Sequence, residues 1–186
     1  EALSCINGKL VFSNLSKLTP QASLKLSTSK FSLSFGSWDL EKARESTIDI
    51  CDKSFEYLSS GQTDVLGFFN TEILTDAAAE SLSKYKGDDL SLDGLSLLSD
   101  KAADSLSKFK GDLSLGGLCE LSDKTAEYFS LHSGSLFLPR VTKLSDVAVQ
   151  KLSHKKGKLF LYGLERMSAK SAKAFSKMNP DYLYLK

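Results

Sequence analysis

The sequence is poor in the residue types that most often build metal and catalytic centres. Its 186 residues include only two histidines, three cysteines and one tryptophan. No pair of cysteines has the spacing of a zinc site, and the helical motif of metalloproteases does not occur. His132 and His154 would supply only two ligands, so we expect both to be ordinary surface residues. The sequence therefore predicts no metal and no cofactor.

A charge excess and a long apolar segment are also missing. Lysine and arginine number 24 against 23 aspartates and glutamates, a net charge of +1. This balance gives no electrostatic basis for binding nucleic acid or an anionic membrane. No run of eighteen apolar residues is present, so we expect no membrane insertion. Five lysines fall among acidic residues and are expected on solvated faces: Lys108, Lys110, Lys155, Lys156 and Lys158.

The sequence motifs of common enzyme classes are absent as well. There is no G-x-S-x-G nucleophile elbow, no G-x-G-x-x-G and no P-loop. Serine is abundant, but most serines occupy fixed positions of an internal repeat. We therefore expect a protein that is not an enzyme.

That internal repeat has a period of about 23 residues. LTDAAAESLSK at 74–84 returns as LSDKAADSLSK at 98–108, and the frame begins again at Leu121, Leu144 and Met167. Such a period predicts a solenoid, in which each unit buries its apolar side only against its neighbours. We divide a single domain, 1–186, into eight units: 1–17, 18–49, 50–73, 74–97, 98–120, 121–143, 144–166 and 167–186.

The unit 98–120 predicts a helix followed by a turn. Ser99 has the chemistry of an N-cap and precedes a first-turn acid. Leu98, Ala102 and Leu106 fall on one helical stripe. We expect Gly111 to end the helix in the left-handed conformation, and Gly87, Gly134 and Gly157 take the same place in other units.

A short alternating segment follows each predicted helix. Period two with apolar ends predicts strands at 10–12, 33–35, 66–68, 90–92, 113–115, 136–138, 159–161 and 182–184. A helix separates successive strands, so the sheet must be parallel. Leu95, Leu118 and Leu164 then direct the chain back towards the next helix. The first unit is expected to begin inside a helix, because residues 1–4 match 80–83.

The pattern L-x-L-x-G-L-x-x-L-S-D-x-A-A-x-x-L resembles a leucine-rich repeat and covers essentially the whole chain. It departs from that family because Leu95 and Leu118 stand where Asn or Cys is usual. The resemblance implies a right-handed α/β solenoid of about eight units, with a parallel sheet on its concave side and helices on its convex side. It implies no catalytic residue, because the family motif is structural.

Cys5, Cys51 and Cys119 fall in repeats that are not adjacent. Neighbouring strands are about 4.8 Å apart, so these cysteines should lie beyond the roughly 7 Å Cα separation that a disulfide allows. Free thiols favour a reducing, cytoplasmic compartment. A secreted solenoid, with its signal removed, stays an open alternative, and the localisation is unknown.

Unit 18–49 is longer than the others, and its excess lies near 36–45, around Trp38. Insertions in repeat proteins map to loops on one face and are often functional. The alternative is that Trp38 simply takes the packing position of Leu118 in a degenerate unit.

The last three predicted strands differ from the others on the concave side. Earlier strands present mostly small or polar residues there, whereas these present Phe137, Phe160, Tyr162, Leu183 and Leu185. A contiguous apolar patch with aromatic anchors is typical of an interaction site. The patch either binds a protein or other macromolecule, or is covered by further repeats, another domain or a second copy of the chain.

The sequence thus favours a non-catalytic repeat scaffold that binds a protein or another macromolecule through its concave sheet. The alternative is a structural spacer within a longer polypeptide, with no ligand of its own. The identity of a partner and the oligomeric state do not follow from the repeat, since one fold serves many functions.

Overall fold

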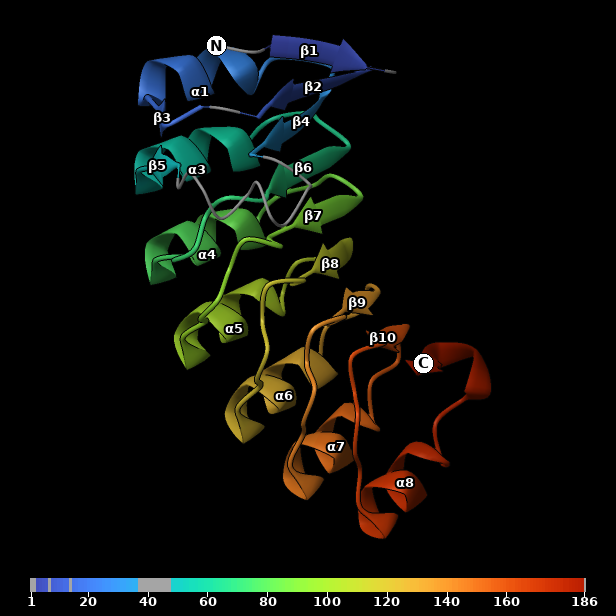
Figure 1. Ribbon diagram of the computed structural model, residues 1–186. Helices are drawn as coiled ribbons and strands as arrows, with labels where there is room; N and C mark the ends of the chain where they lie inside the picture. The colour runs from blue at the N-terminus through green and yellow to red at the C-terminus, as the bar shows by residue number, and fades with distance from the viewer. Residues whose placement is uncertain (1–2, 7, 14, 37–47, 186) are drawn as a thin grey trace.

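The computed structural model describes residues 3–6, 8–13, 15–36 and 48–185. Helices and strands alternate along these segments and stack into a curved array (Figure 1). The helices are α1 (Pro20–Leu26), α3 (Asp52–Ser59), α4 (Asp76–Ser83), α5 (Asp100–Leu106), α6 (Asp123–Ser130), α7 (Asp146–Leu152), α8 (Ala169–Phe175) and the 3-10 helix η1 (Pro180–Tyr182). The strands of the main sheet are β1 (Leu3–Ile6), β2 (Lys9–Phe12), β4 (Ser32–Phe35), β6 (Val65–Phe68), β7 (Asp89–Ser91), β8 (Asp112–Ser114), β9 (Leu136–Phe137), β10 (Leu159–Leu161) and β11 (Leu183–Leu185).

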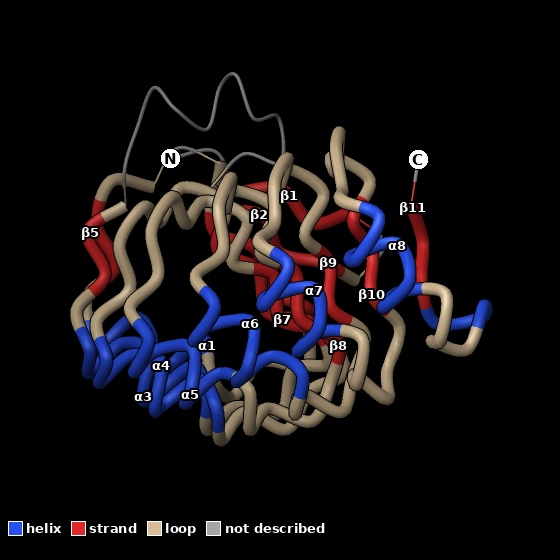
Figure 2. The backbone as a smooth tube through the Cα atoms, turned by 90° about the horizontal axis from the view of Figure 1, so that it is seen from below, coloured by secondary structure: helices blue, strands red, loops and turns tan. Residues whose placement is uncertain are grey.

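The main sheet follows the order of the chain, β1-β2-β4-β6-β7-β8-β9-β10-β11. Every pair from β2 to β11 is parallel. The strands form the inner, concave layer of the curve and the helices the outer layer (Figures 1 and 2). The α/β solenoid expected from the 23-residue period is therefore confirmed.

The first unit differs from the prediction. Residues 3–6 form β1, an antiparallel partner of β2, where a helix was expected. A turn at Gly8, with φ of +76°, joins the two strands. The similarity of residues 1–4 to residues 80–83 was misleading, because four residues are too few to determine a helix.

A second, small sheet pairs β3 (Lys17–Leu18) with β5 (Asp49–Ile50). Lys17 and Asp49 form an ion pair of 2.8 Å across it.

The core lies between the two layers and is built from the repeat positions that the sequence indicated. The helical stripe of α5 is inside, with Ala102 and Leu106 fully buried. Leu95 and Leu118 are also buried, so these leucines pack in the core where the chain turns towards the next helix. At the N-terminal end, stacked phenylalanine rings from β2, β4 and β6 fill the core: Phe12, Phe35 and Phe68, with ring centroids 5.2 and 5.4 Å apart.

The start of each central helix is tied to the preceding helix. Ser99 caps α5 by accepting a hydrogen bond from the Ala102 amide, as predicted for an N-cap. The same hydroxyl donates to Asp76 of α4 at 2.6 Å. This arrangement repeats, and the donors with their acceptors are Thr75 with Asp52, Ser122 with Asp100, Ser145 with Asp123, and Ser168 with Asp146. The first-turn acids therefore connect neighbouring units as well as favouring the positive end of their own helix.

The glycines of the turns have a different role from the one predicted. The positive-φ glycines of the described residues are Gly8 and Gly36 alone, so Gly111 and Gly134 do not end their helices in the left-handed conformation. A Cβ on Gly134 would lie 2.0 Å from the carbonyl oxygen of Gly111, and one on Gly111 would lie 2.2 Å from that of Asp88. These positions require glycine because the backbones of successive units approach closely there.

Candidate functional site

Aromatic side chains from adjacent strands form a stack on the concave face. Four residues are cross-strand neighbours, one on each of the last four strands: Ser114 of β8, Phe137 of β9, Phe160 of β10 and Tyr184 of β11. The rings of Phe137 and Phe160 have centroids 4.3 Å apart and are parallel to within 2°. Tyr184 continues the stack with a centroid 4.3 Å from that of Phe160. We call Phe137, Phe160 and Tyr184 the aromatic stack.

The stack remains accessible from the concave side. Phe137, Phe160 and Tyr184 are all half-buried. Tyr162 lies beside them, 44% exposed, with its ring tilted against that of Phe160 at 5.7 Å. The three predicted patch residues Phe137, Phe160 and Tyr162 are therefore brought together.

The other two predicted patch residues do not belong to this face. Leu183 pairs with Leu159 and Leu185 with Leu161, which places both on the core side of the sheet. Leu183 packs against the core, while Leu185, the last residue of β11, is 40% exposed. The predicted strand at 182–184 began one residue too early, because Tyr182 belongs to η1. A shift of one residue exchanges the two faces of a strand, so Tyr184 takes the place expected for Leu183.

Trp38, the predicted insertion residue, lies outside the described residues.

The concave face changes character before the aromatic stack begins. Gly67 of β6 has no side chain, and the ring of Phe69 occupies the space beside it, 2.8 Å from where a Cβ would lie. The ammonium group of Lys9 lies over that ring, 5.7 Å from its centroid. Small serines follow at Ser91 and Ser114. The face therefore carries only small side chains between Phe69 and the aromatic stack. We call these positions, Gly67, Ser91 and Ser114, the shallow section.

Asp93 borders this shallow section. Its Oδ1 accepts hydrogen bonds from Ser114 Oγ and from the Gly116 amide, both at 2.6 Å, and its Oδ2 accepts from Ser91 Oγ at 2.8 Å. The three bonds hold the carboxylate across β7 and β8. Sequence reasoning missed Asp93, because its position in the repeat is shared with Phe69, Gly116 and Pro139 and shows no pattern of its own.

The two histidines have different environments. His154 is exposed, as expected, but His132 is 1% exposed and lies in a buried column of equivalent turn positions. We call this set the turn column: Tyr85, Phe109, His132, Lys155 and Met178. The rings of Phe109 and His132 stack at 6.3 Å. Neither ring nitrogen of His132 has a hydrogen-bond partner among the described residues.

Lys155, expected on a solvated face, is 4% exposed. Its ammonium donates to the carbonyl oxygens of His132 at 2.6 Å and Gly134 at 2.7 Å. Burial lowers the pKa of Lys155 to about 8, while the Asp112 carboxylate opposes this change. Burial, with the nearby Lys155 charge, lowers the pKa of His132 to about 4. These two backbone oxygens use two of the three donors of the Lys155 ammonium.

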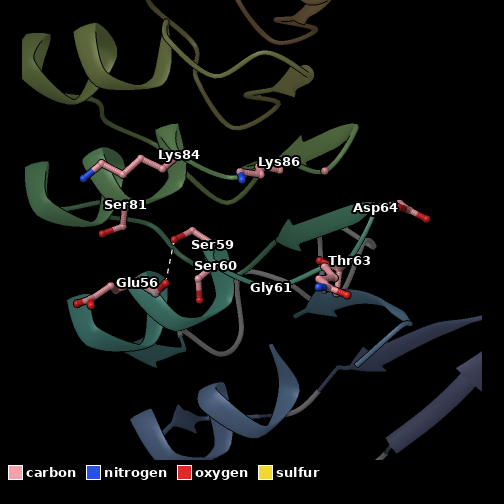
Figure 3. A pocket seen from close by; sticks show the side chains of 11 residues that line it. Glu56, Ser59, Ser60, Gly61, Thr63, Asp64, Ser81, Lys84 and Lys86 are labelled. Carbon is pink, nitrogen blue, oxygen red and sulfur yellow. Dashed lines mark hydrogen bonds between the residues drawn. The ribbon is translucent and has the colours of Figure 1, made fainter. Parts of the chain in front are cut away.

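A cavity of about 520 Å³ lies elsewhere, between α3 and α4 at their C-terminal ends (Figure 3). Its labelled lining residues come from two neighbouring units, with Glu56 and Ser59 on one and Lys84 on the next. Ser59 donates to the Glu56 carbonyl oxygen at 3.0 Å, and Lys84 pairs with Glu80 at 3.0 Å. These polar groups bond within their own helices and do not converge on a common point in the cavity.

Comparison with known proteins found no relative. No family model matches the chain, and no curated protein sequence is similar to it.

Within the described residues, no group of three or more histidines, cysteines, aspartates or glutamates is placed to hold a metal ion. Cys51 and Cys119 are exposed free thiols. None of the described helices is both long and apolar enough to span a lipid bilayer.

Proposed function

We propose that this chain is a non-catalytic binding scaffold that engages a protein partner through the concave face of β9, β10 and β11. The observation that carries the proposal is the aromatic stack. Phe137, Phe160 and Tyr184 lie half-buried on the side of the sheet away from the core, and Tyr162 extends the surface. Aromatic residues are enriched where proteins meet, because each supplies a large apolar area with few rotatable bonds.

The stack also suits binding because its geometry exists before a partner arrives. Three consecutive strands at a spacing of roughly 4.8 Å hold the rings face to face. Such rings lose little conformational freedom on binding, and this lowers the entropic cost of association.

We further propose that the chain is related in architecture to leucine-rich repeats. The support is the strand-plus-helix unit of about 23 residues, with leucines at the buried strand positions such as Leu90, Leu113 and Leu136. Repeat arrays of this kind present a continuous concave surface, which suits a macromolecular partner better than a small molecule.

The experiment compares the parent with a Phe137→Ser/Phe160→Ser variant. Serine is the natural residue at the equivalent positions Ser91 and Ser114, so the strands should tolerate the change. The matched control is Ile73→Ser/Leu97→Ser, which removes two apolar side chains, each 74% exposed, from the loops that lead into α4 and α5. Each protein is analysed by light scattering after size exclusion, and then used as the target for a phage library of random dodecapeptides.

We expect monomers of similar stability, and peptides that bind the parent and the control but not the aromatic variant. A parent dimer that dissociates in the aromatic variant would show that the stack binds a second copy of the chain, and would overturn the proposal of a different protein partner. Peptides that bind all three proteins equally would show that the concave face is not the binding surface.

A further inference from the structure

At the end of the aromatic stack that faces β8, one ring face is covered by no residue of its own column. Phe160 stacks on one side of Phe137 at 4.3 Å. The neighbour on the other side, in register on β8, is Ser114, whose side chain is too small to cover a phenyl ring. The next two positions of the column, Ser91 and Gly67, are small as well. The second face of the Phe137 ring is therefore turned towards the shallow section of the concave surface.

The carboxylate of Asp93 lies on the same side. It is tied to Ser114 Oγ at 2.6 Å, and Ser114 is the direct cross-strand neighbour of Phe137. A carboxylate has about four acceptor positions. Ser114, Gly116 and Ser91 use three of them, two on Oδ1 and one on Oδ2. One acceptor position is left on Oδ2, and Asp93 takes part in none of the ion pairs formed among the described residues.

An aromatic ring face lies on one side of Ser114, and a negative charge is hydrogen-bonded to the Ser114 hydroxyl. These two features define the chemistry of the group that would contact both. The group must be cationic, because the ring face and the carboxylate both attract positive charge. It should also be flat, since a flat cation can lie against the Phe137 ring and still donate in its own plane to Asp93. The guanidinium of arginine has these properties, whereas the ammonium of lysine is a compact, strongly hydrated charge.

We propose that Phe137 and Asp93 form the recognition site for an arginine side chain of the protein partner. The proposal rests on the proposed function, because the arginine is presented by the protein that binds the concave face. Asp93 is positioned by its three hydrogen bonds before the partner arrives, and Phe137 is held by its stack on Phe160. Charge complementarity at this point would fix the register of the partner along the array.

The test uses the dodecapeptides selected on the parent and an Asp93→Asn variant. Asparagine keeps one oxygen for Ser114 and the Gly116 amide, so the local structure should survive, and thermal denaturation checks this. The matched control is Asp88→Asn, which removes the same charge from an exposed position just before β7 in the same unit. Calorimetric titration measures each selected peptide, together with versions in which its arginine is replaced by lysine or norleucine.

We expect the selected peptides to share an arginine. Asp93→Asn should weaken their binding by roughly tenfold, and Asp88→Asn should leave it unchanged. Replacement of the arginine by lysine should also weaken binding. Bound peptide should shift the amide resonance of Gly116 in the parent, because that amide donates to Asp93.

The two proposals fail in different ways. Peptides that fail to bind the Phe137→Ser/Phe160→Ser variant but share no arginine, or that bind Asp93→Asn as tightly as the parent, would overturn the arginine site and leave the binding face in place. A selection that yields only peptides whose binding is unchanged in both the Phe137→Ser/Phe160→Ser and the Asp93→Asn variants would overturn both proposals.

Discussion

His132 and Lys155, the two buried titratable residues discussed above in the turn column, make the stability of this protein depend on pH in a way that its surface charges do not. Lys155 is charged at neutral pH although it is 4% exposed, and its folded-state pKa is lowered from 10.5 to about 8. Between these two values the unfolded chain binds more protons than the folded chain. The free energy of unfolding must therefore rise with pH through this window.

The size of the effect follows from the same values. Each pKa unit corresponds to about 1.4 kcal/mol, so the charged lysine costs the folded state about 3 kcal/mol below pH 8. Linkage then predicts that the free energy of unfolding increases by about 2 kcal/mol between pH 8 and pH 10. Above pH 10 the trend should reverse, since burial raises the pKa of Tyr85 to about 12 and the unfolded tyrosine ionises first.

The decisive variant is Lys155→Met, which introduces the residue found at the next position of the turn column, Met178. Its free energy of unfolding at one pH is a poor test, because the change removes a buried charge and also leaves the His132 and Gly134 carbonyl oxygens without a donor. The slope of the free energy of unfolding against pH tests the reasoning directly. Urea denaturation at several pH values from 8 to 10 should show the 2 kcal/mol rise in the parent and a nearly flat profile in Lys155→Met.

The control is Lys108→Met, which removes an exposed lysine that pairs with Asp104 at 2.8 Å and should leave the slope unchanged. A parent profile that is flat from pH 8 to pH 10 would refute the reasoning, as would an equal slope in the parent and in Lys155→Met. Either result would mean that Lys155 is hydrated in solution and that the turn column is open to water.

Three further predictions concern the same framework. His132 has a pKa lowered to about 4, so stability should fall as the pH drops from 6.5 to 4, by about 3 kcal/mol in all, and urea titrations of His132→Phe should lack this loss. Gly134→Ala should destabilise the protein by about 1–3 kcal/mol in urea denaturation, because its Cβ would lie 2.0 Å from the Gly111 carbonyl oxygen, and an unchanged midpoint would contradict the close approach. Asp100→Ala should cost about 1 kcal/mol, measured in the same way, since it removes the acceptor of Ser122 and Thr125 in the next unit, and a neutral result would show that these bonds between helices add nothing.

Several elements of the fold were predictable because the repeat supplies the same local evidence many times. Ser99 precedes an acid and a run of small and apolar helical residues, and its equivalents at Ser122 and Ser145 confirm the frame. The alternating leucines at 113–115 predict a short strand for the same reason. The pattern of any single unit is weak evidence for its helix and strand. The same spacing in successive units agrees with only one assignment of helix and strand to the repeat.

The predictions failed where one unit departs from the repeat or where the environment comes from a neighbouring unit. Tyr182 and Tyr184 both fit an alternating strand, and only the pairing of β11 with β10 shows that Tyr184 faces the concave side. His132 and Lys155 are polar residues that the sequence alone places at the surface. Their burial depends on the units stacked above and below them.

The sequence by itself thus determined the period, the alternation of helix and strand, the N-caps and the leucine core, because these follow from local patterns that recur at the same spacing in successive units. Only the tertiary structure decided which rings stack on the concave face, which acid is hydrogen-bonded to the cross-strand neighbour of Phe137 and why the turns require glycine. Those features arise between units. Their physical reason is the roughly 4.8 Å separation of adjacent strands, which brings together side chains and backbones about 23 residues apart in the chain.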